Sequence, residues 1–297
     1  MKGNHNTRCR VKSILIVYLD TNAFRDLVEG RHRAVEQSLA LLRKSISKET
    51  IVIAPSFEVF EELVSVLKLD PDGSKNFCQS YDSIVDWDHC FKGMEEILAD
   101  DITSFAKIGK VACPFRPVRE TSQFIQSIRA NEYVLPCGLL KDLIDKGGMQ
   151  KNAFVRNVLN IPDRFRPKTG TKASRKKEYD QEFRSFWEAG GYAEKLGERL
   201  VRDNGELTEI RARGLTGLIK LPTIRLAVGY ILHSKYKQVA DGAIPEESDA
   251  YDFRHAVIAG AVGNIVTNDN KLRNAIHHIP SHNVRIWSLD EFIAQLS

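Results

Sequence analysis

Ser13-Ile-Leu-Ile-Val-Tyr-Leu19 is a nearly continuous apolar run, and Asp20-Thr21-Asn22 follows it directly. Its β-branched residues and its lack of polar alternation are typical of a strand covered on both faces, as in a parallel α/β sheet. The run is far shorter than the ~20 apolar residues that span a bilayer. A secretory leader is not indicated either, because no small-residue cleavage site follows. We expect a buried first strand with Asp20 at its carboxyl end.

The segment after this strand continues the α/β pattern. Residues 23–44 predict one helix, and Ile51-Val-Ile-Ala54 predicts a second short strand. Ser56 is placed to cap a further helix over residues 57–68. The stretch Asp70-Pro-Asp-Gly73 then predicts a break in the chain.

The same alternation returns near the carboxyl end of the chain. Ser248 and Ser288 are placed as helix caps, and Gly263 is placed to end a helix. The expected elements are a helix over 249–262, a strand over 264–267, a helix over 271–277, a strand over 284–287 and a helix over 289–296. Asp290 and Glu291 lie in the first turn of the last helix, where its dipole favours acids.

The middle of the chain differs from its two ends. Residues 71–245 predict helices and loops, with no clear strand pattern. We therefore divide the chain into a polar tail (1–11), two halves of one α/β domain (12–70 and 246–297) and a mainly helical insertion (71–245).

Composition limits the class of protein without identifying it. The chain has 297 residues, 42% of them hydrophobic and 28% charged, which is enough apolar material for a core and argues against general disorder. The net charge of +4 is only weak evidence for an anionic partner. The five cysteines form no C-x-x-C pair, so a disulfide framework or structural zinc site is not indicated, and we expect a reducing, cytoplasmic location. The cysteines are Cys9, Cys78, Cys90, Cys113 and Cys137.

Acidic side chains follow the predicted strands. Asp20 and Asp269 each come just after a strand, and the carboxyl ends of parallel strands share one edge of a sheet. Glu58 and Glu62 lie one helical turn apart beyond the second strand, and Asp249 and Asp252 lead the helix before the Asp269 strand. Carboxylates that share a site raise one another's pKa. Magnesium or manganese, which both prefer oxygen ligands, would relieve that repulsion.

Each acid also has a purely structural interpretation. Asp20 with Asn22 can form a turn, and Asp269 can cap a helix. Asp249 and Asp252 can complement a helix dipole, and the two glutamates can form a solvated face. Taken singly these interpretations are favoured; their occurrence together, in this order after these strands, favours a metal site.

The same residues resemble the PIN-domain nucleases. The family's first strand ends in a pattern like Leu19-Asp20-Thr21-Asn22, and an acid before leucine in the helix after the second strand matches Glu62-Leu63. The pattern of Asp252-Phe-Arg-His255 with Ala256, Ala259 and Ala261, then Ile265-Val-Thr267-Asn-Asp269, is similar to the family's carboxyl-terminal block. The final strand and helix, over 284–292, also look like those of the family. The match covers roughly residues 12–68 and 246–296.

The resemblance implies a fold, a reaction and a set of site residues. The fold would be a PIN-like three-layer α/β fold with a central parallel sheet. Asp20, Glu62, Asp252 and Asp269 would be the catalytic acids that hold Mg²⁺ or Mn²⁺, with Asn22 and Thr267 as polar supports. Glu58 and Glu61 are near alternatives to Glu62, and Glu58 can also serve as a support. Asp249 is either a fifth participant or a helix-start acid. The activity would be endoribonucleolytic, on single-stranded RNA, leaving a 5′-phosphate and a 3′-hydroxyl. His255 is interpreted as a packing residue.

A basic stretch inside the insertion is a second candidate feature. Residues 164–177 read RFRPKTGTKASRKK, with seven positive charges and no negative one. Such a stretch can neutralise RNA phosphates, and its alternative is a solvated loop with no ligand. The candidate contacts are Arg164, Arg166, Lys168, Lys172, Arg175, Lys176 and Lys177.

Other classes of function stay open at this point. The chain can be a non-catalytic RNA-binding or assembly protein that keeps the fold, or a structure-specific DNA nuclease. A phosphatase of the haloacid-dehalogenase type needs D-x-D, and Asn22 stands at its second acid. The long insertion departs from the short PIN toxins. A protein inhibitor of the antitoxin kind and a second copy of the chain remain open as partners, and no membrane partner is expected.

Overall fold

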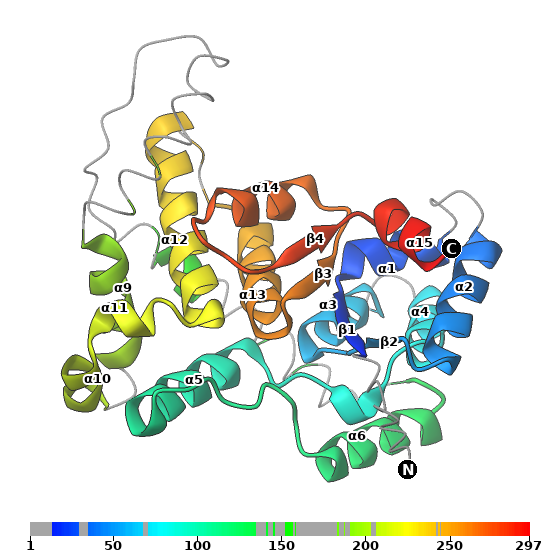
Figure 1. Ribbon diagram of the computed structural model, residues 1–297. Helices are drawn as coiled ribbons and strands as arrows, with labels where there is room; N and C mark the ends of the chain where they lie inside the picture. Colours follow the sequence, from blue (N-terminus) through cyan, green and yellow to red (C-terminus); the bar gives the residue numbers. More distant parts are fainter. Residues whose placement is uncertain are drawn as a thin grey trace, which may run out of the picture.

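The computed structural model is an α/β protein whose strands form one four-stranded sheet (Figure 1). It describes residues 14–29, 35–67, 71–134, 191–202, 206–241 and 245–297, together with Ala243 and isolated residues between 141 and 187. Within these residues no helix is both long enough and apolar enough to cross a membrane.

All four strands run parallel, in the order β2-β1-β3-β4. Their bounds are Leu15–Leu19 (β1), Ile51–Ile53 (β2), Asn264–Val266 (β3) and Arg285–Trp287 (β4). Tyr18 and Leu19 of β1 pair with Ile265 and Val266 of β3. The predicted parallel sheet built from both ends of the chain is confirmed.

The order of the strands creates a switch point between β1 and β3. From β1 the chain moves outward to β2, and from β3 it moves outward in the other direction to β4. At such a point the loops that leave the two central strands diverge, and ligand sites of open α/β sheets lie there, beyond the carboxyl ends of the strands. Asp20 follows β1 and Thr267 follows β3, so both residues lie at this crevice.

Helices cover the sheet on both faces. The helices α1 (Thr21–Val28), α2 (Val35–Ser47) and α15 (Leu289–Leu296) lie on one side, and α13 (Glu247–Val262) and α14 (Asn270–His278) lie on the other (Figure 1). The contacts agree, since α13 packs on β1 and β3 while α2 packs on β2 and α15 on β4. The strands are therefore buried on both faces, as their apolar sequences predict.

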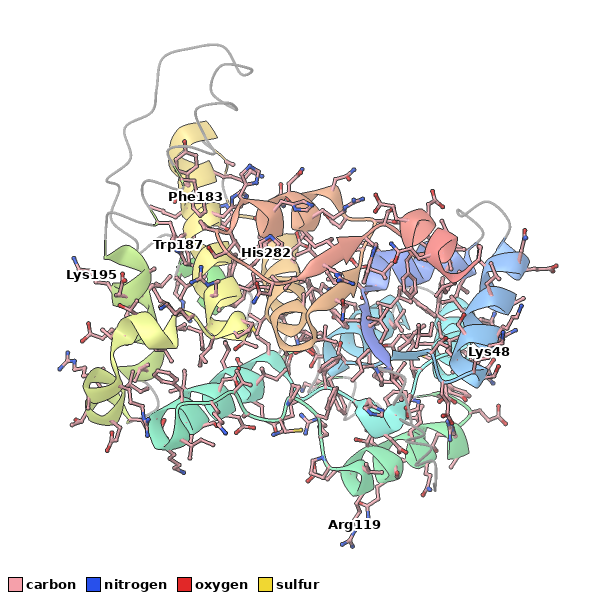
Figure 2. The ribbon with its side chains drawn as sticks, in the orientation of Figure 1. Lys48, Arg119, Phe183, Trp187, Lys195 and His282 are labelled. Carbon is pink, nitrogen blue, oxygen red and sulfur yellow. The ribbon has the colours of Figure 1, made fainter. Side chains whose placement is uncertain are left out.

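The segment between the two halves packs as helices around this core. Its elements are α4 (Pro71–Asp82), a 3₁₀ turn η1 (Trp87–His89), α5 (Met94–Ile108), α6 (Val118–Ala130), α9 (Tyr192–Arg202), α10 (Leu207–Arg213), α11 (Leu215–Leu218) and α12 (Pro222–Asp241). Together with α3 (Phe57–Leu67) they share one hydrophobic core with the sheet. Phe183 packs edge-on against His233 of α12, and Arg225 of α12 lies over the ring of Trp187. Figure 2 labels Phe183 and Trp187.

The helix α12 is held tightly against α13. A Cβ atom at Gly260 of α13 would lie 2.9 Å from the carbonyl oxygen of Pro222, at the start of α12. Asp101 of α5, which is buried, accepts hydrogen bonds from the Thr223 hydroxyl and from Ala112 N at 2.7 Å. The inserted helix thus docks at a fixed position beside the helix that carries Asp252.

The predicted caps are partly confirmed. Ser56 Oγ accepts from Val59 N at 3.2 Å, and Ser288 Oγ accepts from Glu291 N at 3.2 Å. Gly263 ends α13 in the left-handed region, at φ 78°. Ser248 is not the cap of α13, because the helix begins two residues earlier and its cap is Glu246.

Two predicted boundaries near the amino end were wrong. Residues 23–44 are not one helix: α1 ends at Val28 and α2 begins at Val35. Gly30 follows α1 in the sequence, and glycine disfavours a helix interior because of its backbone entropy. The break at residues 70–73 ends before Pro71, which begins α4, and proline suits a first helical position because it has no N–H to leave unpaired.

Candidate functional site

Asp20 lies at the end of β1 and caps the helix that follows. Its Oδ1 accepts from Ala23 N at 2.7 Å, and its own N–H donates to Val266 O at 3.1 Å, which ties it to β3. The side chain is 1% exposed. Burial, with a smaller contribution from Glu62, raises the pKa of this carboxyl from 3.8 to about 6, although His255 and the Thr267 hydroxyl oppose the rise. Asp20 therefore does form the local turn that caps α1, and its carboxyl is also close to the charges of His255 and Glu62.

Asp269 lies at the corresponding place after β3. Its Oδ1 accepts from Lys271 N at 2.6 Å and Leu272 N at 3.0 Å, so it caps α14. Its other oxygen, Oδ2, accepts from Asn22 Nδ2 at 3.4 Å. The Asn22 side chain links the loop after β1 with the loop after β3. Asp269 is both a helix cap and a member of the acid cluster, which consists of Asp20, Glu62, Asp252 and Asp269.

Asp252 on α13 is the acid most affected by another carboxylate. It is 7% exposed, and Tyr230 of α12 donates a hydrogen bond to its Oδ2 at 3.4 Å. Burial and then the charge of Asp269 raise the pKa of Asp252 from 3.8 to about 7, while His255 and Lys271 lower it. Repulsion between two carboxylates is the electrostatic situation that a bound cation relieves.

Glu62 is the glutamate of α3 that faces this cluster. His255 Nε2 donates to Glu62 Oε1 at 3.1 Å. Burial favours the neutral acid, but the charge of His255 and this hydrogen bond outweigh burial and lower the pKa of Glu62. Glu62 is therefore ionised at neutral pH.

Glu58 and Glu61 face a different group. Arg254 Nη2 contacts Glu61 Oε2 and lies 3.7 Å from Glu58 Oε1. Glu58 Oε1 also accepts from Met94 N at 2.8 Å, at the start of α5, where the helix dipole favours an anion. This buried network joins α3, α13 and α5, and it accounts for Glu58 as a structural residue.

Asp249 is placed as a helix-start acid beside the cluster. Its Oδ2 accepts from Glu246 N at 2.7 Å, and its Oδ1 lies 2.6 Å from Lys271 Nζ. Thr267 is fully buried, and its Oγ1 accepts from Asp269 N at 3.0 Å. Thr267 therefore lies between Asp20 and Asp269 as a support.

His255, expected from the sequence to be a packing residue, is a charged member of the site. It is 3% exposed, and its Nδ1 contacts the Tyr18 hydroxyl while Nε2 contacts Glu62. Burial opposes its protonation, but Glu62, Asp20 and Asp252 raise its pKa to about 9. An imidazolium thus lies among three acids. The spacing of Asp252 and His255 on one helical face was the available signal.

The acids of this site offer the oxygen donors that a hard metal ion prefers. Across the described ranges, no three histidine, cysteine or acidic side chains are grouped so that they could hold a metal ion. Magnesium, however, is commonly held by one or two carboxylates with water in the other positions. The mutual repulsion of Asp252 and Asp269, two oxygen-donor side chains, fits that mode of binding and does not require a closed cage.

The basic stretch 164–177 lies outside the described residues, so Arg164, Arg166, Lys168, Lys172, Arg175, Lys176 and Lys177 stay a sequence prediction.

No protein-family model matches the chain, and no curated protein or solved structure matches it significantly. Function is therefore inferred from the geometry of the site.

Proposed function

We propose that this chain is a metal-dependent endoribonuclease with a PIN-like fold, which cuts single-stranded RNA at the switch point of the sheet. The observation that carries the proposal is the convergence of acids from four separate segments. The pKa of His255 is raised by the charges of Asp20, Glu62 and Asp252, and the pKa of Asp252 is raised by the charge of Asp269. The parallel sheet with helices on both faces is compatible with the three-layer fold that the resemblance implies.

Asp252 and Asp269 would hold Mg²⁺ or Mn²⁺, with Asp20 and Glu62 completing the acid set. Once bound, the cation would supply positive charge that polarises the phosphodiester and lowers the pKa of a bound water. Asn22 would orient the Asp269 carboxylate through its hydrogen bond to Oδ2, and the Thr267 hydroxyl would orient Asp20 through its side-chain hydrogen bond. His255 keeps Glu62 ionised and offsets part of the negative charge before a cation binds.

A nuclease assay on single-stranded RNA tests this proposal. We expect cleavage with Mn²⁺ or Mg²⁺, none with EDTA, and products that end in a 5′-phosphate and a 3′-hydroxyl. Asp20→Asn and Asp252→Asn should each reduce the rate by at least about a hundredfold, since even the outer partners of a metal site cost 10–100-fold. Asp290→Asn, an exposed acid at the start of α15, is the matched control and should cut normally. Wild-type rates in both site variants would disprove the nuclease.

One observation favours a second candidate, a non-catalytic RNA-binding protein with the same fold. His255 already places a positive charge among the acids, so the folded chain is partly neutralised without a metal. Under this alternative the chain binds RNA equally well in EDTA and in Mn²⁺, and RNA stays intact in both. Single-stranded DNA tested beside RNA distinguishes the deoxyribonuclease alternative.

A further inference from the structure

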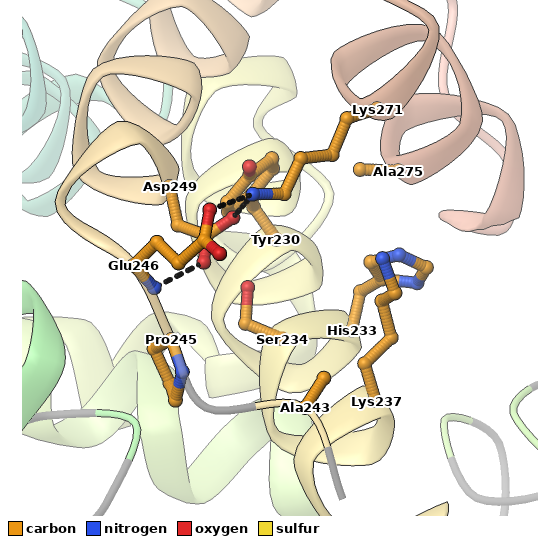
Figure 3. A pocket seen from close by; sticks show the side chains of 10 residues that line it. All are labelled: Tyr230, His233, Ser234, Lys237, Ala243, Pro245, Glu246, Asp249, Lys271 and Ala275. Carbon is orange, nitrogen blue, oxygen red and sulfur yellow. Dashed lines mark hydrogen bonds and ion pairs between the residues drawn. The ribbon is translucent and has the colours of Figure 1, made fainter. Parts of the chain in front are cut away.

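A pocket of about 230 Å³ opens beside the acid cluster, between α12, α13 and α14 (Figure 3). Tyr230, His233, Ser234 and Lys237 of α12 line one side of it, with Asp249 of α13 and Lys271 of α14 also in its wall. Tyr230 belongs both to this pocket and to the acid cluster, because its hydroxyl donates to Asp252 Oδ2. A group bound in the pocket would therefore lie next to the proposed cleavage site.

The charges around the pocket argue against a phosphate ligand. Lys237 and Lys271 are balanced by Glu246 and Asp249, which also line it. Asp249 Oδ1 is only 2.6 Å from Lys271 Nζ, so an anion would have to compete with this carboxylate. A neutral group with both hydrogen-bond donors and acceptors suits such a wall better.

The size and walls of the pocket favour one flat heterocycle. Its volume is below the ~300–1,000 Å³ of sites that take drug-sized ligands, so it fits a single base better than a whole nucleotide. Tyr230 and His233 are only 1% and 5% exposed, so they close the wall of the pocket and leave the base to be held mainly by hydrogen bonds on its edge. His233 is held in place by Phe183, edge-on at 5.9 Å, and by His278, stacked at 5.2 Å. Single-stranded RNA offers such bases, because they can be splayed out and hydrogen-bonded on their edges.

The polar groups select among the bases. Guanine carries two neighbouring acceptors, O6 and N7, which suit the ammonium group of Lys237, whereas Lys271 Nζ is engaged by Asp249, Glu246 and Ser248. Beside O6 it carries two N–H donors, N1–H and N2–H, which suit a carboxylate. A carboxylate has about four acceptor sites, and Asp249 uses two of them, for Lys271 Nζ and Glu246 N. No other standard base places two such donors next to that pair of acceptors.

We infer that this pocket is a subsite for one guanine base of the RNA strand, adjacent to the phosphodiester that the acids cut. The location next to a cleaved bond rests on the proposed function, whereas the binding of the base does not.

Equilibrium binding in EDTA tests the subsite without any cleavage. The probes are fluorescent single-stranded oligouridylates that carry one guanosine, inosine, adenosine or abasic ribose at the same position. We expect guanosine to bind at least about tenfold more tightly than the abasic probe, from one well-formed polar edge contact, with inosine between them because it lacks the N2 amino group. Equal binding of the guanosine and abasic probes would overturn the inference.

Variants of the pocket complete the test. Ser234→Phe should fill the pocket and remove the preference for guanosine. Lys237→Met should weaken it about tenfold and covers the case in which the larger side chain disturbs folding. Lys220→Met, at an exposed lysine just before α12, is the matched control and should keep the preference. If Lys237→Met and a folded Ser234→Phe both preferred the guanosine probe as strongly as the wild type does, the inference would also be overturned. A preference for guanosine without cleavage in Mn²⁺ would support the subsite and refute the nuclease. Cleavage without a preference for guanosine would support the nuclease and refute the subsite.

Discussion

His255 Nε2 donates a hydrogen bond to Glu62 Oε1 across 3.1 Å, and these two residues, 193 positions apart in the chain, join α13 to α3. Because Asp20 and Asp252 also raise the pKa of His255, the imidazolium holds acids of three segments together. A divalent cation and this imidazolium would act on the same acids. We therefore expect the stability of the folded chain to depend on pH, on bound metal and on substitutions that neutralise one of these charges.

The His255–Glu62 pair predicts a loss of stability in alkali. The folded pKa of His255 is about 9 and its ordinary value is 6.5, so its contribution is complete below pH 6.5 and is lost as the pH rises through 9. In EDTA, the melting temperature of the wild type should decrease as the pH is raised from 6.5 to 9. His255→Gln should lower the melting temperature at pH 6.5, since a buried charge that loses its partner costs about 3–5 kcal/mol. The variant should also flatten the dependence on pH. A variant as stable and as pH-dependent as the wild type would refute this role.

Asp252→Asn is predicted to stabilise the metal-free protein while it abolishes activity. The pKa of Asp252 is raised from 3.8 to about 7, so the folded state holds the proton more tightly, and stability falls as the pH rises from 3.8 to 7 and stays low above pH 7. The amide removes that repulsion, and we expect a gain of roughly 2–4 °C in melting temperature for each kcal/mol relieved. The measurement is thermal unfolding in EDTA at pH 8 and pH 5.

The gain from Asp252→Asn should be larger at pH 8, where the whole penalty is present, than at pH 5, where only part of it has developed because the folded carboxyl is still protonated. Asp290→Asn is the control and should show no such difference. A melting temperature of Asp252→Asn below that of the wild type at pH 8 would show that the acid cluster is not under repulsion.

Gly260→Ala is predicted to weaken the docking of α12 on α13. The new methyl group would meet the Pro222 carbonyl oxygen at 2.9 Å and the Thr223 Cα at 3.0 Å, and backbone atoms cannot move aside as a flexible side chain can. We expect a loss of about 1–3 kcal/mol, the usual effect of overpacking, measured by chemical denaturation. Gly93→Ala is the control, because its nearest contact is Glu58 Oε1 at 3.8 Å. Equal stability of the two variants would contradict the close packing.

The sequence could predict the sheet and the place of two acids for a simple physical reason. A run without polar alternation has to be buried on both faces, and parallel strands deliver their carboxyl ends to one edge. Asp20 after β1 and Asp269 after β3 follow from that rule without any knowledge of side-chain packing. Caps such as Ser56 were equally local, because the hydroxyl and its N–H partner are only three residues apart.

The parts that could not be predicted depend on distant partners. His255 contacts Tyr18, 237 residues away, and nothing near it in the sequence reveals that partner. The choice of Glu62 over Glu58 depends on where Arg254 lies, since Arg254 draws Glu58 and Glu61 away from the cluster. The docking of α12, which brings Tyr230 to Asp252, was also hidden within a segment that showed only helical patterns.

Mn²⁺ binding to the purified chain is the most direct measurement, by calorimetry near pH 7.5 with the RNA absent. We predict saturable binding to the wild type, a matching rise in melting temperature because the ion binds only the folded state, and loss of both in Asp252→Asn but not in Asp290→Asn. Absence of saturable Mn²⁺ and Mg²⁺ binding to the wild type, or the same affinity in Asp252→Asn, would contradict a cation site made by these acids.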